Sequence, residues 1–184
     1  MMVWAKYKLM PQDIAVYLFL ENVSHKRENE ILSDLFENYN HMIIWDYRKD
    51  YLLFKQSVMN LICIYELDDR EYQETELILL EVAQTEFDIE KEIDCFGAYF
   101  KLIWLQLMYS GISYRKIKLR NLLRDFGYKR RTAQFINSIN NTLNALKLKT
   151  YLRAYEECDI CNAGLDDMII IRLMEKNVIK VIVS

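Results

Sequence analysis

The sequence predicts a mainly α-helical protein with a small amount of β-structure near its C-terminus. The 184 residues include only four glycines and one proline, so few residues interrupt long helices. Hydrophobic residues make up 52% of the chain, which is enough for one large or two small folded domains. The clearest β-type runs lie late in the chain, at 149–155, 168–173 and 178–183.

Hydrophobic periodicity predicts three helices in the first 67 residues. The first opens at Met10-Pro11, where a proline fits the first turn, and runs to about Val23. The second spans 26–38, and Ser24 is placed to cap it. The stretch 42–45 fits either a short strand or the start of a helix. The third helix spans 51–67, and its expected inward residues are Leu52, Phe54, Val58, Leu61, Ile62 and Tyr65.

A more acidic stretch follows, with a helical pattern over 71–84 and a junction over 87–94. The segment 95–110 is then the most hydrophobic helix, and Gly111 is a natural stop for it. Its apolar stripe consists of Phe96, Phe100, Ile103, Trp104 and Leu107. We place a domain boundary near residue 90, which separates an acidic helical region, residues 1–90, from a C-terminal domain, residues 91–184.

The net charge of −3 is divided unevenly along the chain. Residues 1–110 hold 10 Lys/Arg and 20 Asp/Glu, whereas residues 111–153 hold 11 Lys/Arg and a single acid, Asp125. A basic segment of this kind favours contact with nucleic acid or with an acidic partner. Alternatively, the acidic part covers the basic part within one chain or across a dimer. We expect the acidic region 1–90 to bind a protein partner or a second copy in a homodimer.

The basic segment contains two short amphipathic helices joined by a tight turn. The apolar face of the first consists of Leu119, Leu122, Leu123 and Phe126. Gly127 can take a positive φ and therefore ends this helix. The apolar face of the second consists of Ile136, Ile139, Leu143 and Leu146. Two short helices around a glycine-containing turn are typical of the helix-turn-helix motif.

Two β-type segments, 149–155 and 168–173, follow the second helix, with the polar stretch 156–167 between them. The pattern of this region consists of Leu122-Leu123, Phe126-Gly127, Arg130-Arg131, Ile136, Ile139, Leu143, Leu146, Leu148-Lys149-Thr150, Asp166 and Ile169. With this pattern, residues from about 112 to 173 resemble the winged-helix tails attached to many bacterial restriction and phage-defence proteins. The resemblance implies a mainly α fold with a small β-wing, in which a helical N-terminal region is followed by a winged helix-turn-helix domain.

The second helix is the expected recognition helix, and double-stranded DNA is its expected partner. Cations at the start of such a helix lie beside DNA phosphates, and side-chain amides along it pair with adenine edges. The candidate nucleic-acid-binding residues are Lys118, Arg120, Lys129, Arg130, Arg131, Gln134, Asn137 and Asn141. The alternative is a solvated helix face in a winged helix that binds protein instead of DNA.

The residue pattern gives little support to catalysis, metals or membranes. Cys158-x-x-Cys161 is half of a zinc site, but the other cysteines and the two histidines are not in a paired spacing, so we expect no metal. We find no glycine-rich phosphate loop or nucleophile–histidine arrangement, and expect no catalytic residues and no cofactor. The four cysteines are typical of intracellular thiols. The helix at 96–109 is too short to span a bilayer, and we expect a cytoplasmic protein.

The expected function is that of a non-catalytic, nucleic-acid-binding winged-helix protein. The resemblance to defence-associated tails implies an accessory subunit of a bacterial anti-phage complex, linking a nuclease or an SMC-like ATPase to DNA, or a regulator. The alternative is a protein-interaction module without DNA binding, either a scaffold subunit or a phage-encoded inhibitor of host defence.

Overall fold

The computed structural model describes residues 7–67, 95–125, 128, 130–152 and 156–174. Its elements are α1 (Pro11–Leu20), α2 (His25–Asn38), η2 (Asn40–Met42), η3 (Trp45–Tyr47), α3 (Tyr51–Leu67), α5 (Cys95–Tyr109), β1 (Arg115–Lys118), α6 (Leu119–Asp125), α7 (Ala133–Ala145), β2 (Leu148–Tyr151) and β3 (Met168–Leu173). The predicted class is confirmed at this level: the described part is mainly helical, with a small three-stranded antiparallel sheet.

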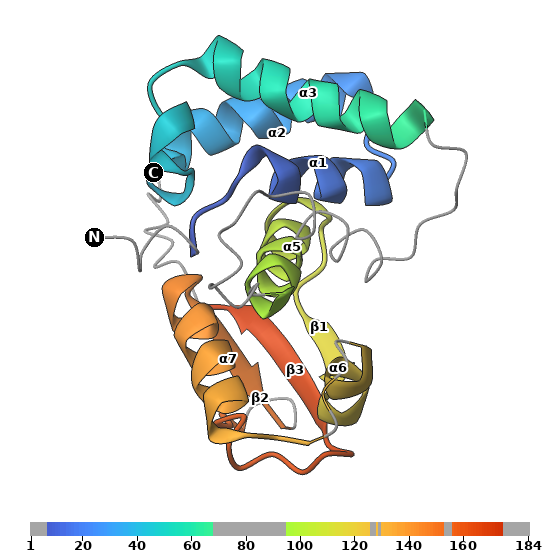
Figure 1. Ribbon diagram of the computed structural model, residues 1–184, viewed down its shortest axis with the longest axis vertical. Helices are drawn as coiled ribbons and strands as arrows, with labels where there is room; N and C mark the ends of the chain where they lie inside the picture. The colour runs from blue at the N-terminus through green and yellow to red at the C-terminus, as the bar shows by residue number, and fades with distance from the viewer. Residues whose placement is uncertain (1–6, 68–94, 126–127, 129, 153–155, 175–184) are drawn as a thin grey trace, which may run out of the picture.

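The helices α1, α2 and α3 form one end of the molecule, and the sheet with α6 and α7 forms the other (Figure 1). Helix α1 is buried along most of its length, because it lies between α3 and α5. It ends where Asn22 takes a left-handed conformation (φ 47°), which lets Val23 N donate to Leu18 O at 3.2 Å. Helix α3 begins after Asp50, whose carboxylate accepts a hydrogen bond from Leu53 N at 3.0 Å.

Helix α5 occupies the middle of the molecule, where it packs on α1, on α7 and on β3. All five residues of its predicted stripe are buried. Lys101 is buried as well, and its ammonium lies 3.0 Å from the carboxylate of Asp13 on α1. The two side chains are 7% and 1% exposed, so this is a buried ion pair. The same Asp13 oxygen also accepts from Met10 N at 2.7 Å, at the start of α1.

Further polar contacts join α5 to the N-terminal helices. Gln106 donates to Glu21 at 3.0 Å, and the hydroxyl of Tyr109 donates to Asp34 at 2.7 Å. The rings of Trp104 and Tyr39 meet edge to face with centroids 5.7 Å apart. Buried apolar residues from Leu9 to Ile171 belong to one core cluster. The domain boundary near residue 90 stays a prediction, because residues 68–94 lie outside the described residues.

The three strands form a sheet in the order β1-β3-β2, with both pairs antiparallel. The central strand β3 places Ile171 opposite both Arg115 of β1 and Thr150 of β2. Ile169 and Ile171 are fully buried, because alternate residues of a strand share one face and this face packs under the helices. Helix α7 packs against this sheet through β2 (Figure 1).

Most predicted helices have the expected bounds, but one prediction of detail is wrong and one strand was not predicted. Leu52 was expected to point inward and is 74% exposed, because Phe54, Val58, Ile62 and Tyr65 already form the inward face of α3. Residues 115–118, for which the sequence pattern indicated no strand, form β1. The predicted turn at 126–127, the helix at 71–84 and the strand at 178–183 lie outside the described residues.

Candidate functional site

The outward face of α7 carries side-chain amides. Thr132 precedes the helix, and its hydroxyl accepts a hydrogen bond from Phe135 N at 3.2 Å, which satisfies one of the free N–H groups of the first turn. The predicted apolar stripe is confirmed as the inward face, since all four of its residues are buried. Asn137 and Asn141 lie on the opposite side and are exposed, with Asn144 continuing the same stripe. The helix therefore presents hydrogen-bonding groups to solvent along a single line.

The predicted basic residues lie around this helix on separate elements. Lys118 ends β1, and Arg130 lies in the segment that leads into α7; both side chains are exposed. Within the described part of the chain, neither of them makes a hydrogen bond or ion pair, so both cations remain available to an external anion. Lys129 lies outside the described residues, and so does the side chain of Gln134.

The side chain of Arg131 is already hydrogen-bonded within the protein. Its guanidinium donates to the backbone oxygen of Ala163 at 2.5 Å and, less closely, to that of Ile160 at 3.4 Å. Both of these loop residues are buried. Arg131 thus fastens the loop 156–167 to the segment before α7, a role that the basic doublet in the sequence did not reveal.

The loop 156–167 between β2 and β3 is acidic and neutralises two nearby cations. Asp166 accepts from Arg120 at 2.7 Å, and Glu157 accepts from Lys149 at 2.6 Å. Asp159 accepts from Cys161 N at 2.9 Å and from Asn140 at 3.1 Å, and these hydrogen bonds lower the pKa of its carboxyl. The loop carries Glu156, Glu157, Asp159, Asp166 and Asp167, so a DNA backbone that approached it would meet fixed negative charge.

The two cysteines of this loop face local polar groups. The thiol of Cys158 donates to Asp159 O at 3.0 Å, and the thiol of Cys161 accepts from Asn140 at 3.6 Å. Burial raises the pKa of Cys158, and hydrogen bonding with Asp159 raises the pKa of Cys161. Zinc binds the deprotonated thiolate, and the raised pKa of each cysteine disfavours that form. Within the described residues, no three His, Cys, Asp or Glu side chains are grouped as metal ligands.

A second basic cluster lies near the other end of α7, and the sequence analysis did not identify it. Lys8 and Arg48 both donate to the backbone oxygen of His41, each at 2.8 Å. Burial, followed by the charges of Lys8, Lys147 and Arg48, lowers the pKa of His41. Lys147, just beyond the end of α7, therefore acts on His41 together with Lys8 and Arg48. The cluster joins segments far apart in the sequence, so spacing alone gave no signal.

Two shallow depressions flank the site. One, of about 330 Å³, lies between α7, β2 and the acidic loop, and the other, of about 340 Å³, lies between α5, β1 and α6. Lys118 lines the second depression together with Lys116 and Asn121. Asp125 borders the same depression, so the cations there already face one carboxylate.

Comparison with protein-family models, with curated proteins and with solved structures returned no match for this chain. Among the described helices, none combines the length and the apolar composition needed to cross a membrane.

Proposed function

We propose that residues 95–174 form a winged helix and that α7 is its recognition helix. The order helix, strand, helix, helix, strand, strand, with the sheet order β1-β3-β2, supports this assignment. In such a domain the loop between β2 and β3 is the wing, and β1 closes the sheet. The sheet order is the observation that carries the proposal. Strands β1 and β2 each pair with β3, which follows β1 by fifty residues in the chain.

The ligand we propose for α7 is double-stranded DNA. Arg130 precedes the helix and Asn137 and Asn141 follow along its outer face, all three exposed. A cation at the start of a recognition helix suits a phosphate, and amides in the following turns suit base edges. Binding of this kind needs no catalytic group, so the proposed role of the chain is to bind DNA without reacting with it.

A place in a bacterial anti-phage complex follows from the resemblance of residues 112–173 to defence-associated winged-helix tails. In that setting the protein is an accessory subunit or a regulator that connects an enzyme to DNA. The enzyme or a second copy would bind the N-terminal helices. Their described part, residues 7–67, is close to charge balance, with six Lys/Arg and nine Asp/Glu, whereas residues 68–94 hold two and eleven.

Replacing Arg130 with Ala tests the DNA contact directly. We expect weaker binding to every duplex sequence and a flatter salt dependence, by about one unit of slope if Arg130 neutralises one phosphate. Fluorescence anisotropy of a labelled duplex, at several salt concentrations, measures both quantities. Lys26→Ala, an exposed lysine on α2 at the other end of the molecule, is the matched control. Equal affinity and slope for Arg130→Ala and the control would move the assignment to protein docking.

Arg131 has to be tested separately, because its guanidinium anchors the acidic loop. Arg131→Lys keeps the charge but loses the planar donor group that reaches Ala163. If Arg131 acts as a loop anchor, Arg131→Lys lowers the stability of the protein as Arg131→Ala does. If it acts only as a phosphate ligand, Arg131→Lys keeps both the stability and the DNA affinity.

The amide stripe of α7 is expected to set sequence preference. Asn137→Ala or Asn141→Ala should change which duplex binds best, at roughly 1–3 kcal/mol for each bidentate amide–base pair removed, with little change in the salt slope. Competition between labelled and unlabelled duplexes of different sequence measures this preference. Asn144→Ala lies further along the helix, where recognition helices contact bases less, and should leave the preference unchanged. A shared effect of all three variants would contradict base contact at Asn137 and Asn141.

The second candidate function, protein docking, is favoured by the acidic loop. Two of the predicted DNA cations are already engaged, Arg120 with Asp166 and Arg131 with the loop backbone. A protein partner whose surface carries both positive and negative charges could bind this face of the domain without any phosphate contact. A scaffold subunit and a phage-encoded inhibitor both belong to this class, and absence of duplex binding at low salt would select it.

A further inference from the structure

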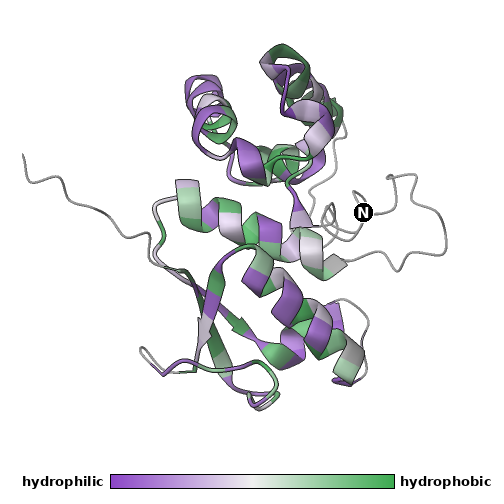
Figure 2. Ribbon diagram, turned by 90° about the vertical axis from the view of Figure 1, so that its left-hand side faces the viewer, coloured by the Kyte–Doolittle hydropathy of each residue, from purple (hydrophilic) through white to green (hydrophobic). Residues whose placement is uncertain are grey.

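Helix α3 is apolar on both of its faces. Its inward residues pack against α1, yet Leu52, Leu53, Ile64 and Leu67 on the outward side are 74%, 47%, 55% and 84% exposed. A surface helix normally carries polar residues opposite its buried stripe, as α2 does. Figure 2 shows more hydrophobic residues on α3 than on α2, its neighbour at the same end of the molecule. The outward face of α3 thus has the composition of a covered surface.

The spacing on this face is that of a helix that packs on another helix. Leu53, Gln56, Asn60, Cys63 and Leu67 follow one another at alternating intervals of three and four residues. Side chains with this spacing form a single seam, and all five are exposed. The apolar residues stand at the two ends of the seam and the two amides stand in its middle.

We propose that this face binds the same face of a second copy, with the two α3 helices antiparallel. A two-fold axis across the middle of the seam brings Gln56 of each copy to Asn60 of the other, and each amide has both a donor and an acceptor to offer. The same axis brings the Leu52 and Leu53 end of each helix to the Ile64 end of its partner. The surface is therefore complementary to itself.

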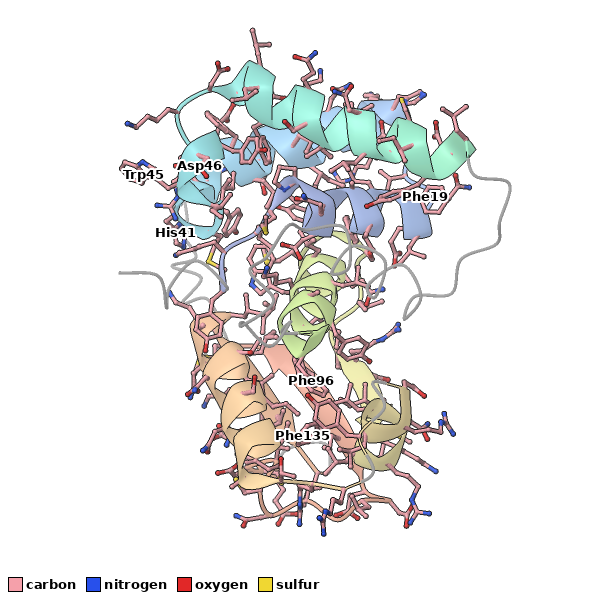
Figure 3. All side chains as sticks on the ribbon, viewed as in Figure 1. Phe19, His41, Trp45, Asp46, Phe96 and Phe135 are labelled. Carbon is pink, nitrogen blue, oxygen red and sulfur yellow. The ribbon has the colours of Figure 1, made fainter. Side chains whose placement is uncertain are left out.

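Charge at the two ends of α3 supports the antiparallel orientation. Lys49 precedes the helix and Glu66 lies in its last turn, both exposed. An antiparallel pair places Glu66 of one copy near Lys49 of the other, whereas a parallel pair would place like charges together. Trp45, 63% exposed, stands beside the start of α3 with the Lys49 ammonium 4.9 Å from its ring centre. Figure 3 shows Trp45 at the edge of the molecule. In the proposed antiparallel pair, Leu67 of the second copy lies beside this ring.

The first test compares masses in solution without DNA, by light scattering over a range of protein concentrations. We expect the mass of two chains, falling to that of one on dilution. The double variant Leu53→Glu/Ile64→Glu should remain a monomer throughout, while Leu165→Glu, an exposed leucine of the acidic loop, should associate as the wild type does. A wild-type chain that is monomeric at every concentration, or a double variant that still dimerises, would overturn the proposal.

A charge exchange tests the orientation without introducing charge into the seam. Lys49→Glu and Glu66→Lys should each weaken association, by up to about tenfold, and the two substitutions together should restore it. Two single effects that simply add would exclude the antiparallel pairing. Both tests are made without DNA, so their failure leaves the proposed DNA contact of α7 unaffected.

Discussion

Replacing Lys101 with Met is expected to cost the protein about 3–5 kcal/mol of stability, because the Asp13 carboxylate is then buried without its counter-ion. Asp13 keeps only the hydrogen bond from Met10 N, and its second oxygen already has no partner in the described structure. Urea denaturation followed by circular dichroism gives the free energy of unfolding. Lys26→Met on the exposed side of α2 is the matched control and should change stability by no more than about 0.5 kcal/mol.

The double variant Asp13→Leu/Lys101→Met separates the ion pair from packing. Because both charges are removed, most of the stability lost in Lys101→Met should return. If Lys101→Met cost no more than the Lys26 control, the pair would not be buried as described. If the double variant were as unstable as the single one, the loss would come from packing of the lysine side chain.

The second large effect is expected at Phe135, which holds α7 to α5. Its ring meets Phe96 edge to face at 4.8 Å between centroids and Tyr128 at 5.3 Å, and its side chain is buried. Figure 3 shows Phe96 and Phe135 side by side between the two helices. Phe135→Ala removes both ring contacts and leaves a cavity, for a loss of about 3–5 kcal/mol.

Phe135→Leu retains much of the buried volume and should cost clearly less than the alanine variant. Tyr128→Ala is the matched control, since Tyr128 belongs to the same ring cluster but is exposed. Urea denaturation of the three variants gives the comparison. A loss in Tyr128→Ala as large as that in Phe135→Ala would show that the ring contacts, and not burial, determine the effect.

Periodicity predicted the helices that are amphipathic over several turns. The inward stripe of α7 follows from such a pattern, and the β-branched run at 168–173 is strand β3. Periodicity failed on the faces of α3, because a helix with apolar residues on all sides does not indicate which side is covered. Leu52 was assigned inward for that reason.

Strand β1 could not be predicted from its own residues. Its sequence, RKIK, has three cations and a single apolar residue, and it is too short to show alternation clearly. It is a strand because β3 pairs with it from more than fifty residues away. The same limit applies to the roles of Lys101, Arg131 and His41, each of which depends on a contact with a segment distant in the sequence.

The position of α5 between two groups of helices makes the protein hard to divide. A fragment starting at residue 95 would expose the face of α5 that covers α1 and leave Lys101 without its carboxylate. The C-terminal part therefore cannot be transferred to another protein by a simple fusion at residue 95. A transferable unit would have to include α1, or a replacement helix that offers a carboxylate opposite Lys101 and an apolar surface around it.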